Sequence, residues 1–234
     1  MSKTAMITFL TIILSSAMII GVYADEANIK TSITKDNFYA VFEFTLDDST
    51  IYENIKNSGQ ITADTVPEAI YQKMISNGLF GVDYFSTSVS FDDNAHAIIC
   101  SFHLRGPSII NSTVDRTAMV ETFRMNTVWR KFNLTIIEGF SYNFTQSLAK
   151  PIAEWTENTT NGITSFSYSN STAGVSCSFE LPNYATNIFA VGETIFFDAP
   201  YELQWEDKII NSPFLILIGL AVVGVIVFAY RKVR

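Results

Sequence analysis

The stretch Phe38-Tyr39-Ala40-Val41-Phe42-Glu43-Phe44-Thr45-Leu46 decides the fold of this chain. Its apolar side chains alternate, which places Phe38, Ala40, Phe42, Phe44 and Leu46 on one face of an extended segment. Such alternation is typical of a half-buried β-strand. The residues Asp47-Asp48-Ser49 follow directly and predict a turn.

Two further patterns lie after this strand. Residues 82–91 and 95–104 flank the turn residues 92–94 and predict a β-hairpin, with Ile98, Cys100, Phe102 and Leu104 on one face. Residues 65–77 predict the one main helix, because Thr65 and Glu68 have the spacing of a capping box and Gly78 follows its end.

The second half of the chain continues with strands. The apolar alternation changes phase near Arg130-Lys131, which predicts a bulge or break there. The polar tract 154–174 predicts a mobile loop or weak edge hairpin, and strands return at 174–181 and 188–197.

We therefore expect an α+β fold that is predominantly β, with an antiparallel, sandwich-like ectodomain. It divides into an α+β part at 30–110 and a β-sandwich-like part at 114–205, unless both parts share one continuous sheet.

Residues 1–24 predict a secretory signal peptide. Lys3 precedes an apolar run from Ala5 to Val22, and Ala24 provides a small residue at the cleavage point. The run is also long enough to act as an uncleaved N-terminal anchor. Either alternative exports the residues that follow.

Residues 213–230 predict a transmembrane helix, because no charged side chain occurs between Pro213 and Tyr230. The basic tail 231–234 then stays in the cytoplasm by the positive-inside rule. The alternative is a buried helix of a soluble protein. We expect a single-pass cell-membrane protein that contacts lipid through this helix and has residues 25–212 outside.

The ectodomain 25–212 is acidic. It holds all 23 Asp and Glu residues but only 11 of the 15 Lys and Arg residues, a net charge of −12 within a total of −8. Because such a surface repels polyanions, we exclude nucleic acid as a partner.

Cys100 and Cys177 are the only cysteines, and both lie in the exported segment. We expect them to form a disulfide, with two buried free thiols as the alternative. Two cysteines are too few for a tetrahedral zinc site.

Asparagines that begin Asn-x-Ser/Thr sequons predict N-glycosylation of the ectodomain. They are Asn111, Asn133, Asn143, Asn158 and Asn170. The alternation around Asn133 and Asn143 places both on the solvent face of their strands.

Catalytic and metal-binding signals are weak. We expect His96 and His103 to lie on opposite faces of one strand, as ordinary strand residues. The acidic pairs 47–48, 92–93 and 206–207 could bind Ca²⁺, but turn formation explains them better. Core packing likewise explains the aromatic residues better than carbohydrate stacking. We therefore expect no catalytic residue, no metal site and no cofactor.

The plan of the chain resembles that of single-anchor surface proteins of archaea in its sequons, few cysteines and short basic tail. This resemblance covers the two ends and carries no functional residue. We expect a non-enzymatic cell-surface glycoprotein that binds a protein partner, either an envelope component or a membrane complex. The alternatives are an anchored hydrolase that uses carboxylates and a solute-binding accessory of a transporter.

Overall fold

The computed structural model describes residues 26–137 and 140–201. The segments 1–24, 213–230 and 231–234, for which the sequence predicts a signal peptide, a membrane helix and a cytoplasmic tail, lie outside the described residues. Within the described ranges, no helix is both long enough and apolar enough to span a bilayer.

The described chain is predominantly β with a few helices, which confirms the β-rich α+β class. The strands are β1 (Glu26–Ile33), β2 (Phe38–Thr45), β3 (Asp83–Asp92), β4 (Ala97–Arg105), β5 (Ile110–Asp115), β6 (Val120–Asn126), β7 (Asn133–Ile137), β8 (Phe140–Asn143), β9 (Thr156–Thr160), β10 (Ile163–Asn170), β11 (Val175–Glu180), β12 (Thr186–Val191) and β13 (Thr194–Pro200). The helices are α2 (Ser49–Ser58), α3 (Thr65–Ser76) and the single turn α4 (Phe144–Ser147), with 3₁₀ turns η1 (Val128–Arg130) and η2 (Ile152–Glu154).

The chain divides into two compact units. The first unit comprises residues 1–113 and 122–199, and the second comprises residues 114–121 and 200–234. Within the second unit, the Tyr201 amide donates to the Met119 carbonyl at 3.0 Å. The surfaces described below belong to the first unit.

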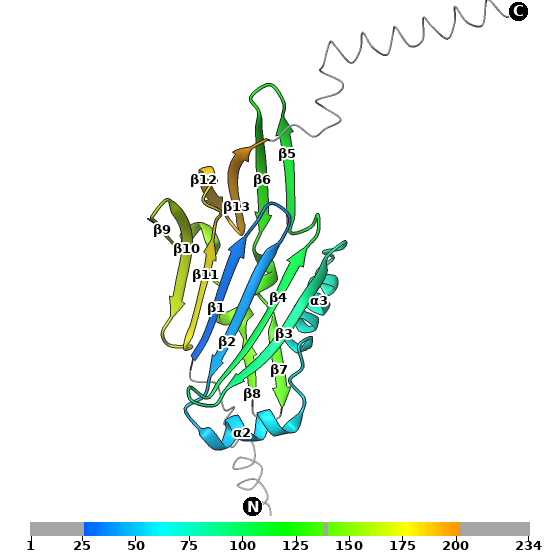
Figure 1. Cartoon of the computed structure of the whole chain (residues 1–234), viewed down its shortest axis with the longest axis vertical. Coiled ribbons are helices and arrows are strands. Elements are labelled where there is room, and N and C mark those ends of the chain that lie inside the picture. The colour runs from blue at the N-terminus through cyan, green and yellow to red at the C-terminus, as the bar shows by residue number, and fades with distance from the viewer. Residues whose placement is uncertain (1–25, 138–139, 202–234) are drawn as a thin grey trace, which may run out of the picture. The chain divides into compact units, whose positions relative to one another are not determined.

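A seven-stranded sheet of order β3-β4-β2-β1-β11-β10-β9 dominates the first unit (Figure 1). Its neighbouring strands are antiparallel except for β1 and β11, which pair in parallel with Ile29 opposite Cys177. This parallel pair joins strands from the two halves of the sequence into one sheet. The remaining strands form a four-stranded sheet, β12-β13-β6-β5, and the β7-β8 hairpin.

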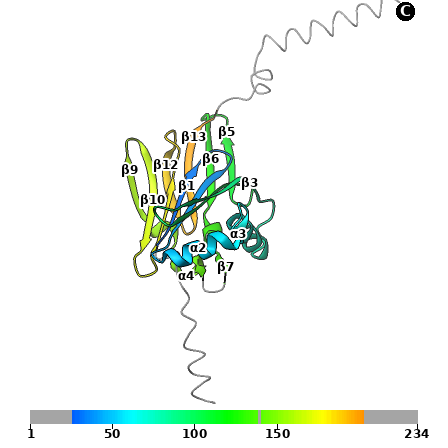
Figure 2. The same cartoon turned by 60° about the horizontal axis from the view of Figure 1, so that its bottom comes forward.

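The alternating residues of β2 place their aromatic rings in the core, as the sequence predicted. Phe38, Phe42 and Phe44 are fully buried. The Phe42 ring centroid lies 5.8 Å from that of Phe132 and 6.0 Å from that of Phe144, both supplied by the second half of the chain. Each such ring contributes about 1.5–3 kcal/mol through burial. One face of the large sheet is therefore covered and the other is left open (Figure 2).

Helix α3 and the β3-β4 hairpin confirm two predictions from the sequence. The predicted capping box of Thr65 and Glu68 is wrong. Thr65 is the first helical residue and Asp64 is the N-cap. The Thr65 hydroxyl accepts from the Thr62 amide at 2.8 Å, whereas Glu68 accepts from the Tyr84 hydroxyl at 2.9 Å. The tertiary bond to Tyr84 takes the carboxylate that a capping box needs.

Helix α2 is absent from the sequence prediction, which interpreted residues 47–49 as a turn. Asp48 caps this helix by accepting from the amides of Thr50 and Ile51 at 2.8 and 3.3 Å. Tyr52 and Ile55 are the buried residues of the helix. Few positions of this helix are apolar, so its sequence shows little helical periodicity. Packing against the rest of the fold stabilises it instead. The predicted break near Arg130-Lys131 is the 3₁₀ turn η1.

The predicted disulfide between Cys100 and Cys177 is wrong. Both cysteines are free and buried. They lie in one cross-strand row, in which Cys100 faces Phe42, Phe42 faces Ile29, and Ile29 faces Cys177. Three strand spacings separate them by roughly 14 Å, whereas a disulfide needs Cα atoms within about 7 Å. The alternative of two buried thiols is the one observed.

Candidate binding surface

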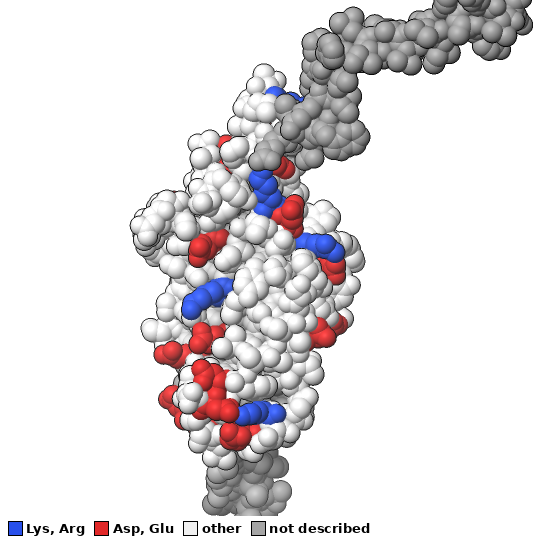
Figure 3. Space-filling model, viewed as in Figure 1, with Lys and Arg blue, Asp and Glu red and all other residues white. Residues whose placement is uncertain are grey.

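The open side of the seven-stranded sheet, here called the outer face, is the candidate functional surface. It consists of Phe85, Ser88 and Ser90 on β3, Ile99, Ser101, His103 and Arg105 on β4, Tyr39, Val41 and Glu43 on β2, Asn28, Lys30 and Ser32 on β1, Ser176, Ser178 and Glu180 on β11, Ser165, Ser167 and Ser169 on β10, and Thr156 and Asn158 on β9. Few of these side chains are charged. Figure 3 shows a largely uncharged centre, with acidic residues gathered at the lower end near α2.

Four side chains that contact one another in sequence, here called the aromatic row, cross the outer face over β3, β4 and β2. The Arg105 guanidinium lies 4.8 Å from the Phe85 ring, Phe85 lies 5.0 Å from His103, and His103 lies 4.8 Å from Tyr39. The register produces the row, because His103 is the cross-strand partner of both Phe85 and Tyr39. Tyr39 ends the row with 37% of its surface exposed.

His103 occupies the middle of the aromatic row, with its Nδ1 buried and without a hydrogen-bond partner. His96 does not lie on β4 but in the turn before it, with φ of +47°, and its ring centroid lies 5.4 Å from that of Tyr52 in a tilted arrangement. The two histidines therefore sit in separate surroundings, although the predicted reason, opposite faces of one strand, is wrong. No group of three or more His, Cys, Asp or Glu residues within 26–137 and 140–201 is arranged to hold a metal ion.

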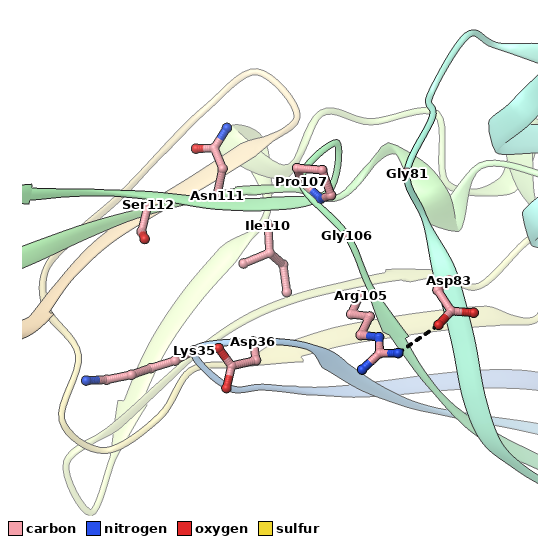
Figure 4. A pocket seen from close by; sticks show the side chains of 10 residues that line it. All are labelled: Lys35, Asp36, Gly81, Asp83, Arg105, Gly106, Pro107, Ile110, Asn111 and Ser112. Carbon is pink, nitrogen blue, oxygen red and sulfur yellow. Dashed lines mark hydrogen bonds and ion pairs between the residues drawn. The ribbon is translucent and has the colours of Figure 1, made fainter. Parts of the chain in front are cut away.

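A groove of about 540 Å³ adjoins the Arg105 end of the aromatic row (Figure 4). The turn residues Lys35 and Asp36 lie on one side of it, and Asp83 and Arg105 lie on the other. Arg105 Nη2 donates to Asp83 Oδ2 at 2.9 Å. The same guanidinium thus belongs to both the groove and the aromatic row.

Backbone contact fixes one wall of the groove. Gly106 has φ of +140°, and a Cβ placed there would lie 2.1 Å from the Gly81 carbonyl oxygen. Only glycine fits this approach. The Ser108 hydroxyl donates to the Phe80 carbonyl and holds the loop on the same segment.

The opposite half of the outer face, on β9, β10 and β11, is rich in hydroxyl groups. A shallow depression of about 390 Å³ is lined there by Asn28, Thr156 and outward-facing serines, including Ser176, whose hydroxyl donates to Asn28 Oδ1 at 3.1 Å. Alternating serines at 165, 167, 169, 176 and 178 are the visible sequence signal for this half. The aromatic row leaves no comparable pattern in the sequence, because its residues come from three different strands.

The sequon asparagines occupy different sides of the first unit. Asn133 and Asn143 are exposed on β7 and β8, on the side of these strands opposite the buried Leu134 and Tyr142. In Figure 4 the Asn111 side chain points away from the side of β5 that carries Ile110 and Ser112. The outer face holds an acceptor only at Asn158, on its far edge strand β9.

Asn170 differs from the other acceptors because its side chain is engaged and half-buried. Its Nδ2 donates to the Ser147 carbonyl at 3.1 Å, and its Oδ1 accepts from the Ala173 amide at 3.2 Å. This asparagine fastens the end of β10 to the residue that ends α4.

The acidic pairs suggested for Ca²⁺ have local structural roles where the structure describes them. Asp92 accepts from the amides of Asn94 and Ala95 in the β3-β4 turn. Asp93 accepts from the Tyr52 hydroxyl at 2.7 Å and from Lys56, and these two hydrogen bonds, that of Lys56 first, hold its pKa below the usual value. The pair 206–207 lies outside the described residues.

No protein-family model, curated protein or solved structure matches this chain.

Proposed function

We propose that the chain is an exported, membrane-tethered module that binds a protein partner through the β3-β4-β2-β1 part of its outer face. The observation that carries this proposal is the aromatic row, which crosses an open sheet face that is otherwise weakly charged. Interfaces are enriched in Tyr, Phe and Arg and depleted in charge at their centres. The row offers these residues preassembled, so that binding orders little that is mobile.

The positions of the sequons also favour the outer face as the partner-binding surface. Glycans at Asn133 and Asn143 would project from β7 and β8, neither of which belongs to the large sheet. Asn111 lies on β5, also outside the large sheet, but it lines the groove at the Arg105 end of the aromatic row, so a glycan there would limit a partner at that end. A glycan at Asn158 would stand on β9, at the edge opposite β3. Because glycans are bulky and solvated, the face that lacks acceptors is the face available to a partner.

The packing of the rings in the aromatic row favours a protein partner over a polysaccharide. A sugar ring stacks on an exposed aromatic face. The Phe85 and His103 rings stack with an interplanar angle of 18°. The Tyr39 ring packs on the other side of His103, with an interplanar angle of 37°. These rings cover one another and leave little free face for a sugar.

The hydrolase alternative lacks support from the carboxylates. A general acid needs a raised pKa. Burial alone would raise the pKa of Glu193, but Lys131 and Arg130 outweigh it and lower the value. Asp83, on the groove, is paired with Arg105. The solute-binding alternative needs an enclosed apolar cavity, whereas the groove is rimmed by charged residues.

Purification of the full-length chain from host membranes in mild detergent tests the proposal. The wild-type chain is expected to elute as a complex with one defined protein. Tyr39→Asp, which places a charge at the exposed end of the aromatic row, is expected to release that protein. Ser141→Asp, on exposed β8, is the matched control and is expected to retain it. A wild-type chain that elutes alone, or a partner retained by Tyr39→Asp, contradicts the proposal.

A further inference from the structure

Two predicted glycan acceptors face each other across the β7-β8 hairpin. Asn133 begins the sequon 133–135 and Asn143 begins the sequon 143–145. The antiparallel register makes Asn133 the direct partner of Asn143. Both side chains are exposed, whereas the next pair in the ladder, Leu134 and Tyr142, is buried.

The hairpin cannot easily spread to separate these two side chains. The Tyr142 ring lies 5.3 Å from Phe44, and Phe144 lies 6.0 Å from Phe42, so the hairpin is packed on the aromatic core. The Phe132 carbonyl also accepts from the Thr145 amide at 3.3 Å, one step beyond the Asn133 to Asn143 pair.

Directly opposed side chains in such a ladder have Cβ atoms about 4.5–5.5 Å apart. A hexose ring with its substituents is wider than this separation. Two glycans that leave the same face at adjacent positions would therefore overlap at their first sugars. Only one of the two asparagines can carry a glycan without distorting the hairpin.

The amide of Asn143 already has a structural role. Its Oδ1 accepts from the Gln146 amide at 3.0 Å and caps α4, while its Nδ2 lies 3.5 Å from Gln146 Oε1. Attachment of a sugar to Nδ2 would replace one of its two hydrogens and place a bulky group beside the contact with Gln146. Attachment at Asn133 leaves this helix cap intact.

We propose that Asn133 and Asn143 form one modification site, which carries a single glycan on Asn133 while Asn143 remains the cap of α4. This inference rests on the proposed function, because glycosylation requires export. The hairpin then presents one glycan on the side of the first unit away from the outer face.

Intact mass of the full-length chain expressed in its host tests this inference. The variant Asn111→Gln, Asn158→Gln, Thr172→Ala keeps only the sequons at 133 and 143, and Thr172→Ala spares the hydrogen bonds of Asn170. One glycan per chain is expected, and glycopeptide mapping should place it on Asn133; a single glycan on Asn143 would overturn the assignment. A further Asn133→Gln change is expected to move the glycan to Asn143, whereas Asn143→Asp, which preserves the cap, is expected to leave one glycan in place.

A control variant separates failure of the inference from failure of the proposed function. It carries Thr135→Ala, Thr145→Ala and Thr172→Ala and so keeps Asn111 and Asn158, which lie in different sheets; it is expected to carry two glycans. Two glycans, or none, on the 133 and 143 variant overturn the inference while the control is glycosylated. A control without glycan contradicts export as well.

Discussion

Arg130 is fully buried, and its Nη2 donates to Glu193 Oε2 at 2.7 Å from a position 63 residues earlier in the chain. Its Nη1 donates to the carbonyl and hydroxyl oxygens of Thr127 at 2.8 and 2.7 Å. The guanidinium also lies 4.8 Å from the Trp155 ring. The β12-β13 turn, which contains Glu193, is thereby tied to η1.

Removal of the Glu193 carboxylate should destabilise the fold strongly. Glu193→Ala leaves the buried Arg130 charge without its partner, and breaking a buried pair in this way costs about 3–5 kcal/mol. Asp83→Asn is the matched control, because the Arg105 to Asp83 pair is 57% and 58% exposed; it should change stability by about 1 kcal/mol or less. Chemical denaturation measures both. Equal, small effects would contradict a structural role for Glu193.

Glu193 also predicts an acid-sensitive component of stability. Lys131 and Arg130 lower its folded pKa below the ordinary value of 4.5, although burial opposes them. Its contribution is therefore complete above about pH 4.5 and is lost as the pH falls through the folded pKa. In denaturation series from pH 7 to pH 3, Glu193→Gln should lose less stability on acidification than the wild type. Parallel curves for the two chains would refute this assignment.

Gly106 should tolerate no side chain. A Cβ there meets the Gly81 carbonyl oxygen at 2.1 Å, so Gly106→Ala should cost about 3 kcal/mol or more through backbone displacement. Gly162→Ala is the matched control, because Gly162 has φ of +78° but a Cβ added to it would meet no atom within 4 Å; it should cost about 1–2 kcal/mol. Thermal denaturation compares them. A Gly106→Ala chain as stable as the wild type would contradict the close backbone contact between Gly106 and Gly81.

Local patterns in the sequence predicted most of the large sheet. Alternation found β2 and the β3-β4 hairpin, because these strands bury one face each. It could not reveal the parallel pairing of β1 with β11, which joins residues almost 150 positions apart. The disulfide prediction failed for this reason, since spacing along the chain says nothing about how many strands lie between two cysteines.

The two thiols should be unreactive in the folded chain and reactive once it unfolds. Burial raises the pKa of both Cys100 and Cys177 to about 12, with Arg130 partly opposing the shift at Cys177. The thiolate is the nucleophile, so alkylation with iodoacetamide at pH 8 should label neither cysteine natively and both in denaturant without reductant. Mass spectrometry counts the labels. If the unfolded, unreduced chain took no label, the two cysteines would form a disulfide after all.

Asn170 should be the least occupied sequon outside the β7-β8 pair. Its Nδ2 bonds the Ser147 carbonyl at 3.1 Å in a half-buried position, where a sugar would displace that contact. Glycopeptide analysis should find Asn111 and Asn158 occupied and Asn170 largely bare. Full occupancy at Asn170 would mean that this end of β10 is open in solution.

The candidate surface was less predictable than the fold. The sequence marked the sequons and the exposed faces of individual strands, but the aromatic row depends on the register among β2, β3 and β4. A bulge between Phe85 and Ser88 sets which β3 residue faces His103, and alternation alone does not locate it. Arg130 likewise gave no sign of burial, because its partner Glu193 belongs to a distant turn.

Site-specific photocrosslinking on intact cells tests the central claim most directly. A photoreactive amino acid at position 39, at the exposed end of the aromatic row, should form one discrete adduct with an extracellular or membrane protein. The same probe at position 141, on exposed β8, should form none. Adducts of equal yield from both positions, or none from position 39, would contradict a partner-binding outer face on an exported module.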